Sequence, residues 1–297
     1  MLAQQHSVRF LTCAALLTAT ALAEPRLADD PTGLLMFTDE TANGDFAALN
    51  GAELSAARRG VRLDVYQHRS GDTQIDFGFD YEYTRYEYRN VPSRNRDLHR
   101  AHWPVRLTTK AAGHRLDAYV APGIATSSNV VKDFIRRGSG EDWYVNGGFE
   151  FTSDSSSVHW IVGAAYDRIF GDDELYPVLG VAIEPTASTS VRLAYPVSRF
   201  TYVANDDRRL DLTVFPAGQL WHVRTDDFTG EFNYEMQAWR AQLRLSQQIW
   251  KRLSVDIGGG YEFNREHRFE GANAVPVVGD VDDAWFVRLG MRVSFTP

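Results

Sequence analysis

The stretch DAWFVRLGMRVSF, residues Asp283 to Phe295, decides the fold predicted for this chain. Side chains of a β-strand point to opposite faces in turn, so residues two apart share a face. One face of this stretch is entirely apolar and consists of Trp285, Val287, Leu289, Met291, Val293 and Phe295. The other face carries Arg288 and Arg292, with a glycine between them. A strand with one apolar and one polar face is typical of a β-barrel that spans a membrane.

The same period of two recurs along the chain. Similar alternation runs through Gln74–Thr84, Ala101–Leu107, Val158–Tyr166 and Leu253–Phe263. A soluble β-sandwich also alternates, so three further features are needed to favour a barrel. The predicted strands run about 10 to 15 residues, longer than the five or six usual in soluble sheets. Aromatic residues gather near the strand ends, and short connections alternate with long ones, as in bacterial outer-membrane barrels.

Composition excludes several other classes of protein. The 297 residues include 31 basic and 39 acidic side chains, for a formal net charge of −8. The arginines alternate with acids and form no patch, so no nucleic-acid partner is expected. Mean hydropathy is negative, at −0.33, and no segment after the N-terminus is apolar enough for a membrane helix. A membrane protein of this composition must therefore cross with strands.

The first 23 residues are predicted to be a cleaved signal peptide. Phe10–Leu22 is an apolar run, and Ala21-Leu22-Ala23 fits the small-x-small pattern of signal peptidase, with cleavage after Ala23. The run is shorter than the roughly 20 residues that a membrane helix needs. Cys13, the single cysteine, lies inside this signal, so the mature protein is expected to have neither disulfide nor acyl anchor.

The rest of the chain is predicted to be a single up-and-down antiparallel β-barrel. Residues 24–54 are a poorly specified N-terminal segment that could cover the periplasmic mouth, and residues 55–297 form the barrel. If the chain reverses at Pro196–Arg199 and an extra strand precedes Arg59, the barrel has 14 strands. If Ser190–Val203 is one strand kinked at Pro196, the number is nearer 12. The prediction is therefore a barrel of 12 to 14 strands.

Two segments carry a resemblance to a known family. One runs from Tyr176-Pro177-Val178-Leu179-Gly180 through Tyr195-Pro196 to Tyr202, and the other from Gly258 through Tyr261-Glu262-Phe263 to Arg265. Together they resemble a family of Gram-negative outer-membrane barrels known only as a domain of unknown function. The resemblance implies an outer-membrane location and a barrel architecture, and it implies no activity and no site residue.

The final strand also resembles the C-terminal signature by which the barrel-assembly machinery recognises its clients. The signature normally ends in the aromatic residue, whereas Thr296 and Pro297 follow Phe295 here. The expected partners are therefore this machinery during biogenesis, and outer-membrane lipid and lipopolysaccharide afterwards. Small polar solutes are further candidates.

The candidate functional residues are charges on the inward face of the last three long strands. They are Arg240 and Arg244, then Asp256 and Glu262, then Arg288 and Arg292. Charges are expected inside because Arg or Lys on the lipid face costs roughly 2–4 kcal/mol near the midplane. These columns could form a constriction that selects solutes by the sign of their charge. They could equally be ion pairs that hold the wall together.

No cofactor, metal or catalytic residue is predicted. His99 and His102 are three residues apart and so point to opposite sides of a strand, which is unsuitable for one metal ion. Ser157 and His159 share a face, but no G-x-S-x-G turn is present. Three hypotheses remain in order: a passive or weakly selective channel, a non-conducting structural barrel with a plugged lumen, and a membrane-embedded hydrolase.

One long connection, Ser127–Asp142, has an amphipathic character. Its apolar residues could form a short helix that folds into the lumen as a constriction or lies on the outer surface. In the second case its basic residues, Lys132, Arg136 and Arg137, could contact lipopolysaccharide phosphates.

Overall fold

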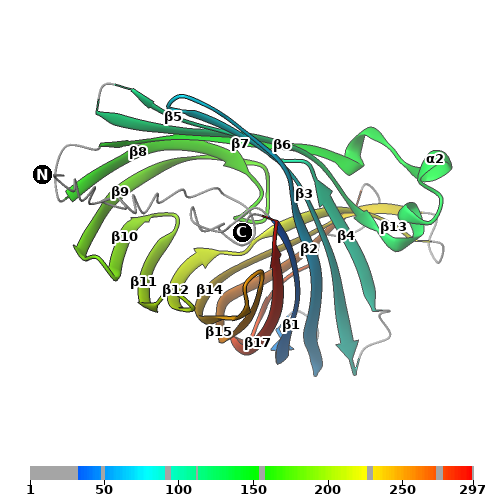
Figure 1. Ribbon diagram of the computed structural model, residues 1–297. Helices are drawn as coiled ribbons and strands as arrows, with labels where there is room; N and C mark the ends of the chain where they lie inside the picture. The colour runs from blue at the N-terminus through cyan, green and yellow to red at the C-terminus, as the bar shows by residue number, and fades with distance from the viewer. Residues whose placement is uncertain are drawn as a thin grey trace, which may run out of the picture.

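In the part of the chain that the structure describes, seventeen β-strands follow one another and hydrogen-bond into one closed sheet (Figure 1). The computed structural model describes residues 33–47, 51–90, 95–111, 113–153, 158–225, 230–271 and 277–295, so the predicted signal peptide lies outside it. The strands are β1 (Gly33–Phe46), β2 (Ala52–Ser70), β3 (Thr73–Arg89), β4 (Arg96–His102), β5 (Val105–Ala111), β6 (His114–Ser127), β7 (Trp143–Ser153), β8 (Val158–Asp167), β9 (Glu174–Thr186), β10 (Thr189–Tyr195), β11 (Ser198–Asn205), β12 (Arg208–Pro216), β13 (Gln219–Thr225), β14 (Gly230–Trp250), β15 (Leu253–Gly271), β16 (Val277–Val281) and β17 (Ala284–Ser294). Two single-turn helices, α1 (Ser128–Val131) and α2 (Phe134–Arg137), and a 3₁₀ turn, η1 (Gly140–Asp142), connect β6 to β7. No helix among the described residues is long and apolar enough to cross a membrane.

The seventeen strands occupy fourteen positions around the barrel. β4 and β5 both pair with β3 and β6, β12 and β13 both pair with β14, and β16 and β17 both pair with β15. The first break falls at Pro104, which has no backbone N–H for the ladder. Consecutive positions are antiparallel throughout, and β1 closes the ring on β17. The chain also reverses at Pro196, between β10 and β11, so of the predicted range of 12 to 14 the described strands give 14.

β1 lies within the segment 24–54 that the sequence left unassigned, so residues 33–46 belong to the barrel wall and do not cover its mouth. It pairs with β17 on one side and with β2 on the other. The alternation is hard to recognise because both faces change character along the strand. Leu35 and Asp39 are both buried inside, whereas Met36 and Glu40 both face outward.

The outward face forms an apolar band. On β17, Trp285, Val287 and Leu289 are 69%, 64% and 55% exposed, whereas Arg288 between them is buried. The rings of Tyr261 and Trp285 pack 4.9 Å apart at the edge of this band where β17 begins. Aromatic side chains with an apolar body and a polar tip favour the membrane–water interface. This is the lipid-facing surface that the sequence predicts.

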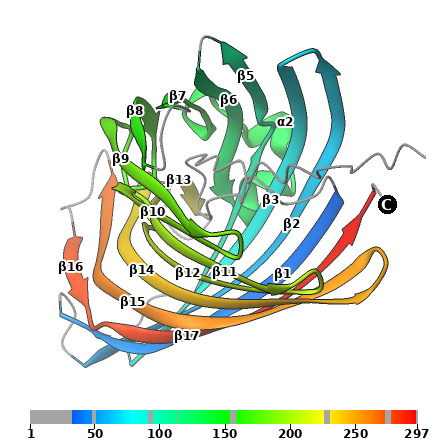
Figure 2. The ribbon, with the colours of Figure 1, turned by 60° about the vertical axis from the view of Figure 1, so that its left-hand side comes forward.

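Strand length divides the barrel into two sections. β2, β3, β14 and β15 have 17 to 21 residues, whereas the strands from β8 to β12 have 7 to 13. Beyond the ends of the short strands, β13 pairs in parallel with β6, His222 opposite Thr126, and so bypasses β7–β12. We call the part enclosed by β1–β4, β6 and β13–β16 the narrow section, and the fourteen-position part nearer the chain termini the wide section. Figure 2 brings the short strands β9–β12 forward, with β13 behind them.

An apolar core fills the narrow section. Trp221, Tyr86 and Tyr234 are at most 1% exposed, and the Tyr86 and Tyr234 rings lie 5.3 Å apart. The Tyr234 hydroxyl bonds to the Tyr88 hydroxyl at 2.8 Å and to Nδ1 of His267 at 2.6 Å, so the polar atom of Tyr234 is satisfied. Each buried aromatic or large aliphatic side chain contributes roughly 1.5–3 kcal/mol relative to exposure. The interior of this section is therefore packed like the core of a soluble protein.

Candidate functional site in the wide section

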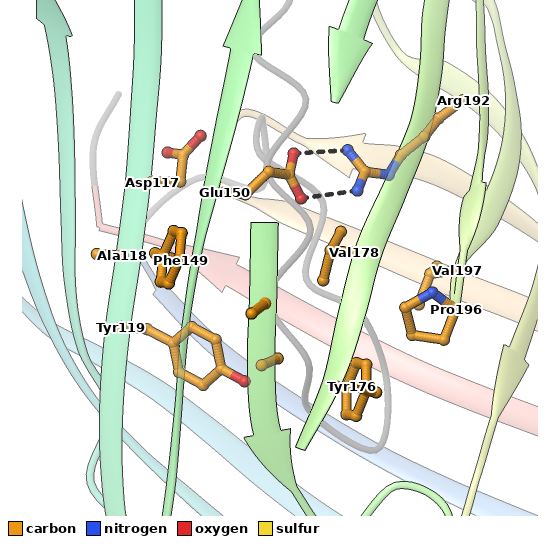
Figure 3. Close-up of a pocket in the computed structure, with 12 residues that line it drawn as sticks. Asp117, Ala118, Tyr119, Phe149, Glu150, Tyr176, Val178, Arg192, Pro196 and Val197 are labelled. Carbon is orange, nitrogen blue, oxygen red and sulfur yellow. Dashed lines mark hydrogen bonds and ion pairs between the residues drawn. The ribbon is translucent and has the colours of Figure 1, made fainter. Parts of the chain in front are cut away.

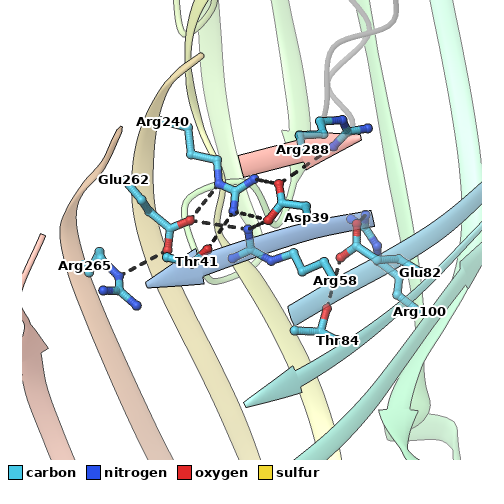
Figure 4. A network of polar contacts seen from close by, with 10 residues as sticks. All are labelled: Asp39, Thr41, Arg58, Glu82, Thr84, Arg100, Arg240, Glu262, Arg265 and Arg288. Atoms are coloured by element: carbon cyan, nitrogen blue, oxygen red, sulfur yellow. Dashed lines mark hydrogen bonds and ion pairs between the residues drawn. The ribbon is translucent and has the colours of Figure 1, made fainter. Parts of the chain in front are cut away.

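A network of buried ion pairs, which we call the belt, lies in the lumen on the wide-section side of the apolar core (Figure 4). Arg240 on β14 contacts Asp39 on β1 at 2.6 Å and Glu262 on β15 at 2.7 Å. Arg58 on β2 reaches the same two carboxylates, at 3.7 Å from Asp39 and 3.4 Å from Glu262. Because β1 and β14 are not neighbours in the sheet, these contacts span the lumen. Arg265 and Arg288 complete the network at 3.2 Å from Glu262 and 3.9 Å from Asp39.

The six lumen charges proposed from the sequence all lie inside and are buried. Two of their expected mutual pairs are present. Arg240 pairs with Glu262 across β14 and β15, and Arg292 lies 3.9 Å from Asp256. The other two pair outside the set, Arg244 with Asp211 on β12 at 3.2 Å and Arg288 with Asp39.

Sequence reasoning missed the residues that turn these columns into a network. Asp39 lies in the segment that the sequence left unassigned. Arg265 is displaced by a bulge: Asn264 has a φ of 51°, and the inward face moves from even to odd residue numbers there. Strict alternation from Asp256 would place Arg265 on the lipid side. No periodic pattern reveals such a bulge, although an Asn with positive φ is among the common ways to make one.

A second polar contact crosses the lumen under the short strands. Glu150 on β7 and Arg192 on β10 form a bidentate pair at 2.7 and 2.8 Å, with two strands between them (Figure 3). The intervening wall carries little side-chain volume at this height, because Gly163 faces Glu150. A Cβ atom on Gly163 would lie 2.1 Å from the Phe149 carbonyl oxygen, so glycine is required there. A bidentate guanidinium–carboxylate pair is directional and rigid.

This pair borders a small amphipathic space, which we call the alcove. Its lining combines Asp117, Glu150 and Arg192 with the side chains of Tyr119, Tyr176, Val178 and Val197 (Figure 3). The hydroxyls of Tyr176 and Tyr119 donate to Asp167 at 2.7 and 3.2 Å. Since Asp167 ends β8, these bonds fix the start of the next loop.

That loop, residues 168–173, connects β8 to β9 at the step between the two sections. The backbone N–H of Gly218 donates to the Ile169 carbonyl at 2.6 Å, which ties the loop to the start of β13. Phe170 stacks on Tyr195 with ring centroids 5.9 Å apart and packs 6.1 Å from Trp239. Arg168 lies over the Tyr144 ring at 4.7 Å. One short loop thus joins the short strands to the narrow section.

Toward the chain termini the lumen is wider. A cavity of about 290 Å³ is lined by the ends of β11, β12, β14, β15 and β17, including Arg209, Asp256 and Arg292. A space of this size holds several water molecules. The lumen therefore has room for water at one end and is filled by the apolar core at the other.

The residues considered for other chemistry fall in different places. His102 faces inward and bonds to Asp80 at 2.9 Å, whereas His99 faces outward and bonds to Tyr81 and Ser128. Nδ1 of His159 bonds to the Ser153 carbonyl at 2.6 Å, and Ser157 lies outside the described residues. His222 lies beside two glutamates that the sequence analysis did not connect with it.

Comparison with known proteins supports the architecture. No model of a known protein family matches the chain, and no curated protein matches it. The COG4313 outer-membrane channel from Pseudomonas putida F1 is similar in structure, with a TM-score of 0.50 and 9% identity, over 91% of this chain and 99% of that one. The toluene transporter TodX of P. putida has a TM-score of 0.45 and 10% identity, over 90% of this chain and 91% of that one. The chain thus has the fold of a single β-barrel similar to that of the COG4313 channel, and the resemblance to an uncharacterised barrel family stays a prediction.

Proposed function

We propose that this protein is an outer-membrane channel for small polar solutes that is closed at rest and conducts along the side of the barrel formed by β7–β12. The observation that carries the proposal is the unequal closure of the two sides. The core of the narrow section blocks one side with many interlocked side chains. On the other side, the Glu150–Arg192 ion pair crosses the alcove, and the loop of residues 168–173 is tied to the start of β13 by the hydrogen bond from Gly218 to Ile169.

The chemistry of this path favours polar solutes with weak charge preference. Glu150 and Arg192 neutralise each other, and Asp117 pairs with Arg115 at 2.8 Å. Mixed signs at short range leave little net field along the path. The similarity to a protein described as an outer-membrane channel supports the general role. It does not distinguish among solutes.

Single-channel recording in planar bilayers tests the proposal. Wild-type protein is expected to be mostly closed. Replacing residues 169–172 by two serines, or Arg192→Ala, should give discrete conductance steps, because the first change removes the loop contact with β13 and the second removes the ion pair that crosses the alcove. Arg240→Ala is the matched control, since it breaks the belt but leaves the core above it in place.

A second function, a non-conducting structural barrel, is favoured by the core of the narrow section and by the belt. That reading gains support if neither alcove variant conducts although both remain folded and heat-modifiable. Conductance through the Arg240→Ala variant alone would show that the path runs through the narrow section instead.

The expected partners fit the same location. Segment 128–142 lies outside the lumen, where Ile135 is fully exposed and Arg136 is 83% exposed at its side chain. We propose that this segment meets lipid or lipopolysaccharide at the outer surface. Recognition of the final strand by the barrel-assembly machinery is proposed on its apolar alternation.

A further inference from the structure

Three side chains from separate elements meet outside the barrel wall, at the narrow section. Glu141 comes from η1, His222 from β13 and Glu231 from the start of β14. One ligand atom of each, two carboxylate oxygens and an imidazole nitrogen, lies within 4.8 Å of the others. His222 is only 4% exposed, whereas its two neighbours are largely exposed. The residues therefore form a shallow site with a buried imidazole at its base.

The hydrogen bonds of His222 leave one ring nitrogen without a proton donor. Nδ1 lies 3.2 Å from the Asn233 side-chain oxygen and 3.3 Å from Glu141, and these two acceptors favour a proton on this nitrogen. Nε2 has no hydrogen-bond partner among the described residues. A carboxylate oxygen of Glu231 lies 3.4 Å from Nε2. A metal ion or a proton between these two atoms would bind both.

The spacing suits a transition-metal ion. Ligands at about 2.0–2.2 Å from a tetrahedral Zn²⁺ lie about 3.3–3.5 Å apart, and Nε2 and Glu231 Oε2 are 3.4 Å apart. The other oxygen of Glu231 lies 3.0 Å from Nε of Arg224 in an ion pair, which favours this orientation of the carboxylate. Glu141, 71% exposed, can turn to supply the third ligand and leave a fourth position for water.

We propose that Glu141, His222 and Glu231 bind a divalent transition-metal ion, for which Zn²⁺ is the probe. One imidazole with two carboxylates suits Zn²⁺ better than Ca²⁺, which takes six to eight oxygen ligands. The ion would fasten segment 128–142 to β13 and β14, where the parallel β6–β13 contact closes the narrow section.

Calorimetric titration of the detergent-solubilised barrel at pH 7.5 tests the site. Wild type should bind one Zn²⁺ per chain, and His222→Gln or Glu141→Gln should weaken binding at least ~10-fold. The doubly substituted control, His114→Gln with Glu270→Gln, removes one histidine and one glutamate outside the site and should bind as wild type does.

Trypsin provides a readout independent of affinity, because Lys132, Arg136 and Arg137 lie in the fastened segment. Zn²⁺ should slow cleavage there in wild type and leave the rate in His222→Gln unchanged. Equal Zn²⁺ binding by wild type and His222→Gln would overturn the proposal, as would no saturable binding. Protection by acidification alone, with no effect of Zn²⁺, would also overturn it and assign a proton to the site.

Discussion

The two sides of the barrel are closed in different ways. Over β1–β4 and β13–β16, the strands continue past the apolar band and enclose a core built around Trp221, Tyr86 and Tyr234. Over β7–β12, the strands stop early, and the contacts across this side are the Glu150–Arg192 ion pair and the hydrogen bond that ties the loop 168–173 to β13. A packed core opens only by unfolding, whereas an ion pair and a loop can separate at modest cost. One sheet can therefore combine a packed apolar core on one side with a few separable polar contacts on the other.

A substitution in the apolar core should lower the free energy of unfolding more than one elsewhere in the barrel. Trp221→Ala leaves a cavity among fully buried rings and is expected to lower the free energy of unfolding by about 3–5 kcal/mol. Guanidinium unfolding in detergent measures it. Trp160→Ala, a lipid-facing change on β8, should have a much smaller effect. Equal losses for the two variants would mean that the narrow section has no cooperative core.

The belt should show the second-largest loss in the free energy of unfolding. Arg240→Ala leaves Asp39 and Glu262 buried beside each other, and breaking such a pair typically costs about 3–5 kcal/mol. The loss should fall at the lower end because Arg58 contacts both carboxylates. The same unfolding experiment on Arg58→Ala/Arg240→Ala should show a loss greater than the sum of the two single losses. Strict additivity would contradict the shared network.

A tight contact between β1 and β2 should give an intermediate effect. A Cβ on Gly60 would lie 2.3 Å from the Phe37 ring, over which Arg288 packs at 3.8 Å. Gly60→Val should therefore destabilise by about 1–3 kcal/mol through overpacking. Gly140→Ala is the control because open space surrounds its Cβ position. Melting temperatures that do not differ between the variants would place Phe37 elsewhere.

The smallest effect is expected outside the apolar band. Arg85 and Glu87 form a pair at 2.9 Å with side chains 43% and 41% exposed. Exposed pairs contribute about 0–1 kcal/mol, and salt screens them. Arg85→Ala should change the unfolding free energy by no more than that at 150 mM salt. A larger loss would show that this face is covered by lipid or a partner.

The sequence predicts the wall well and the closure of the lumen poorly. Alternation in Asp283–Phe295 identifies the lipid face because lipid imposes the same demand on every outward position. It also assigns Arg240 and Glu262 to the inside. It cannot show that Arg240 also contacts Asp39, because that contact depends on barrel curvature and joins strands that β15 and β17 separate in the sheet. The direct β6–β13 pairing joins residues remote in sequence, so no local pattern predicts the narrow section.

The parallel contact of β6 with β13 has a consequence for folding. The Thr126 hydroxyl donates to the His222 carbonyl across 96 residues. Closing so long a loop is unfavourable for a disordered chain but much less so once the intervening strands have zipped into hairpins. The sheet around β7–β12 should therefore form early and bring both ends of the loop together. The aromatic core would then be the last part to acquire slow amide exchange, even though it is the most tightly packed.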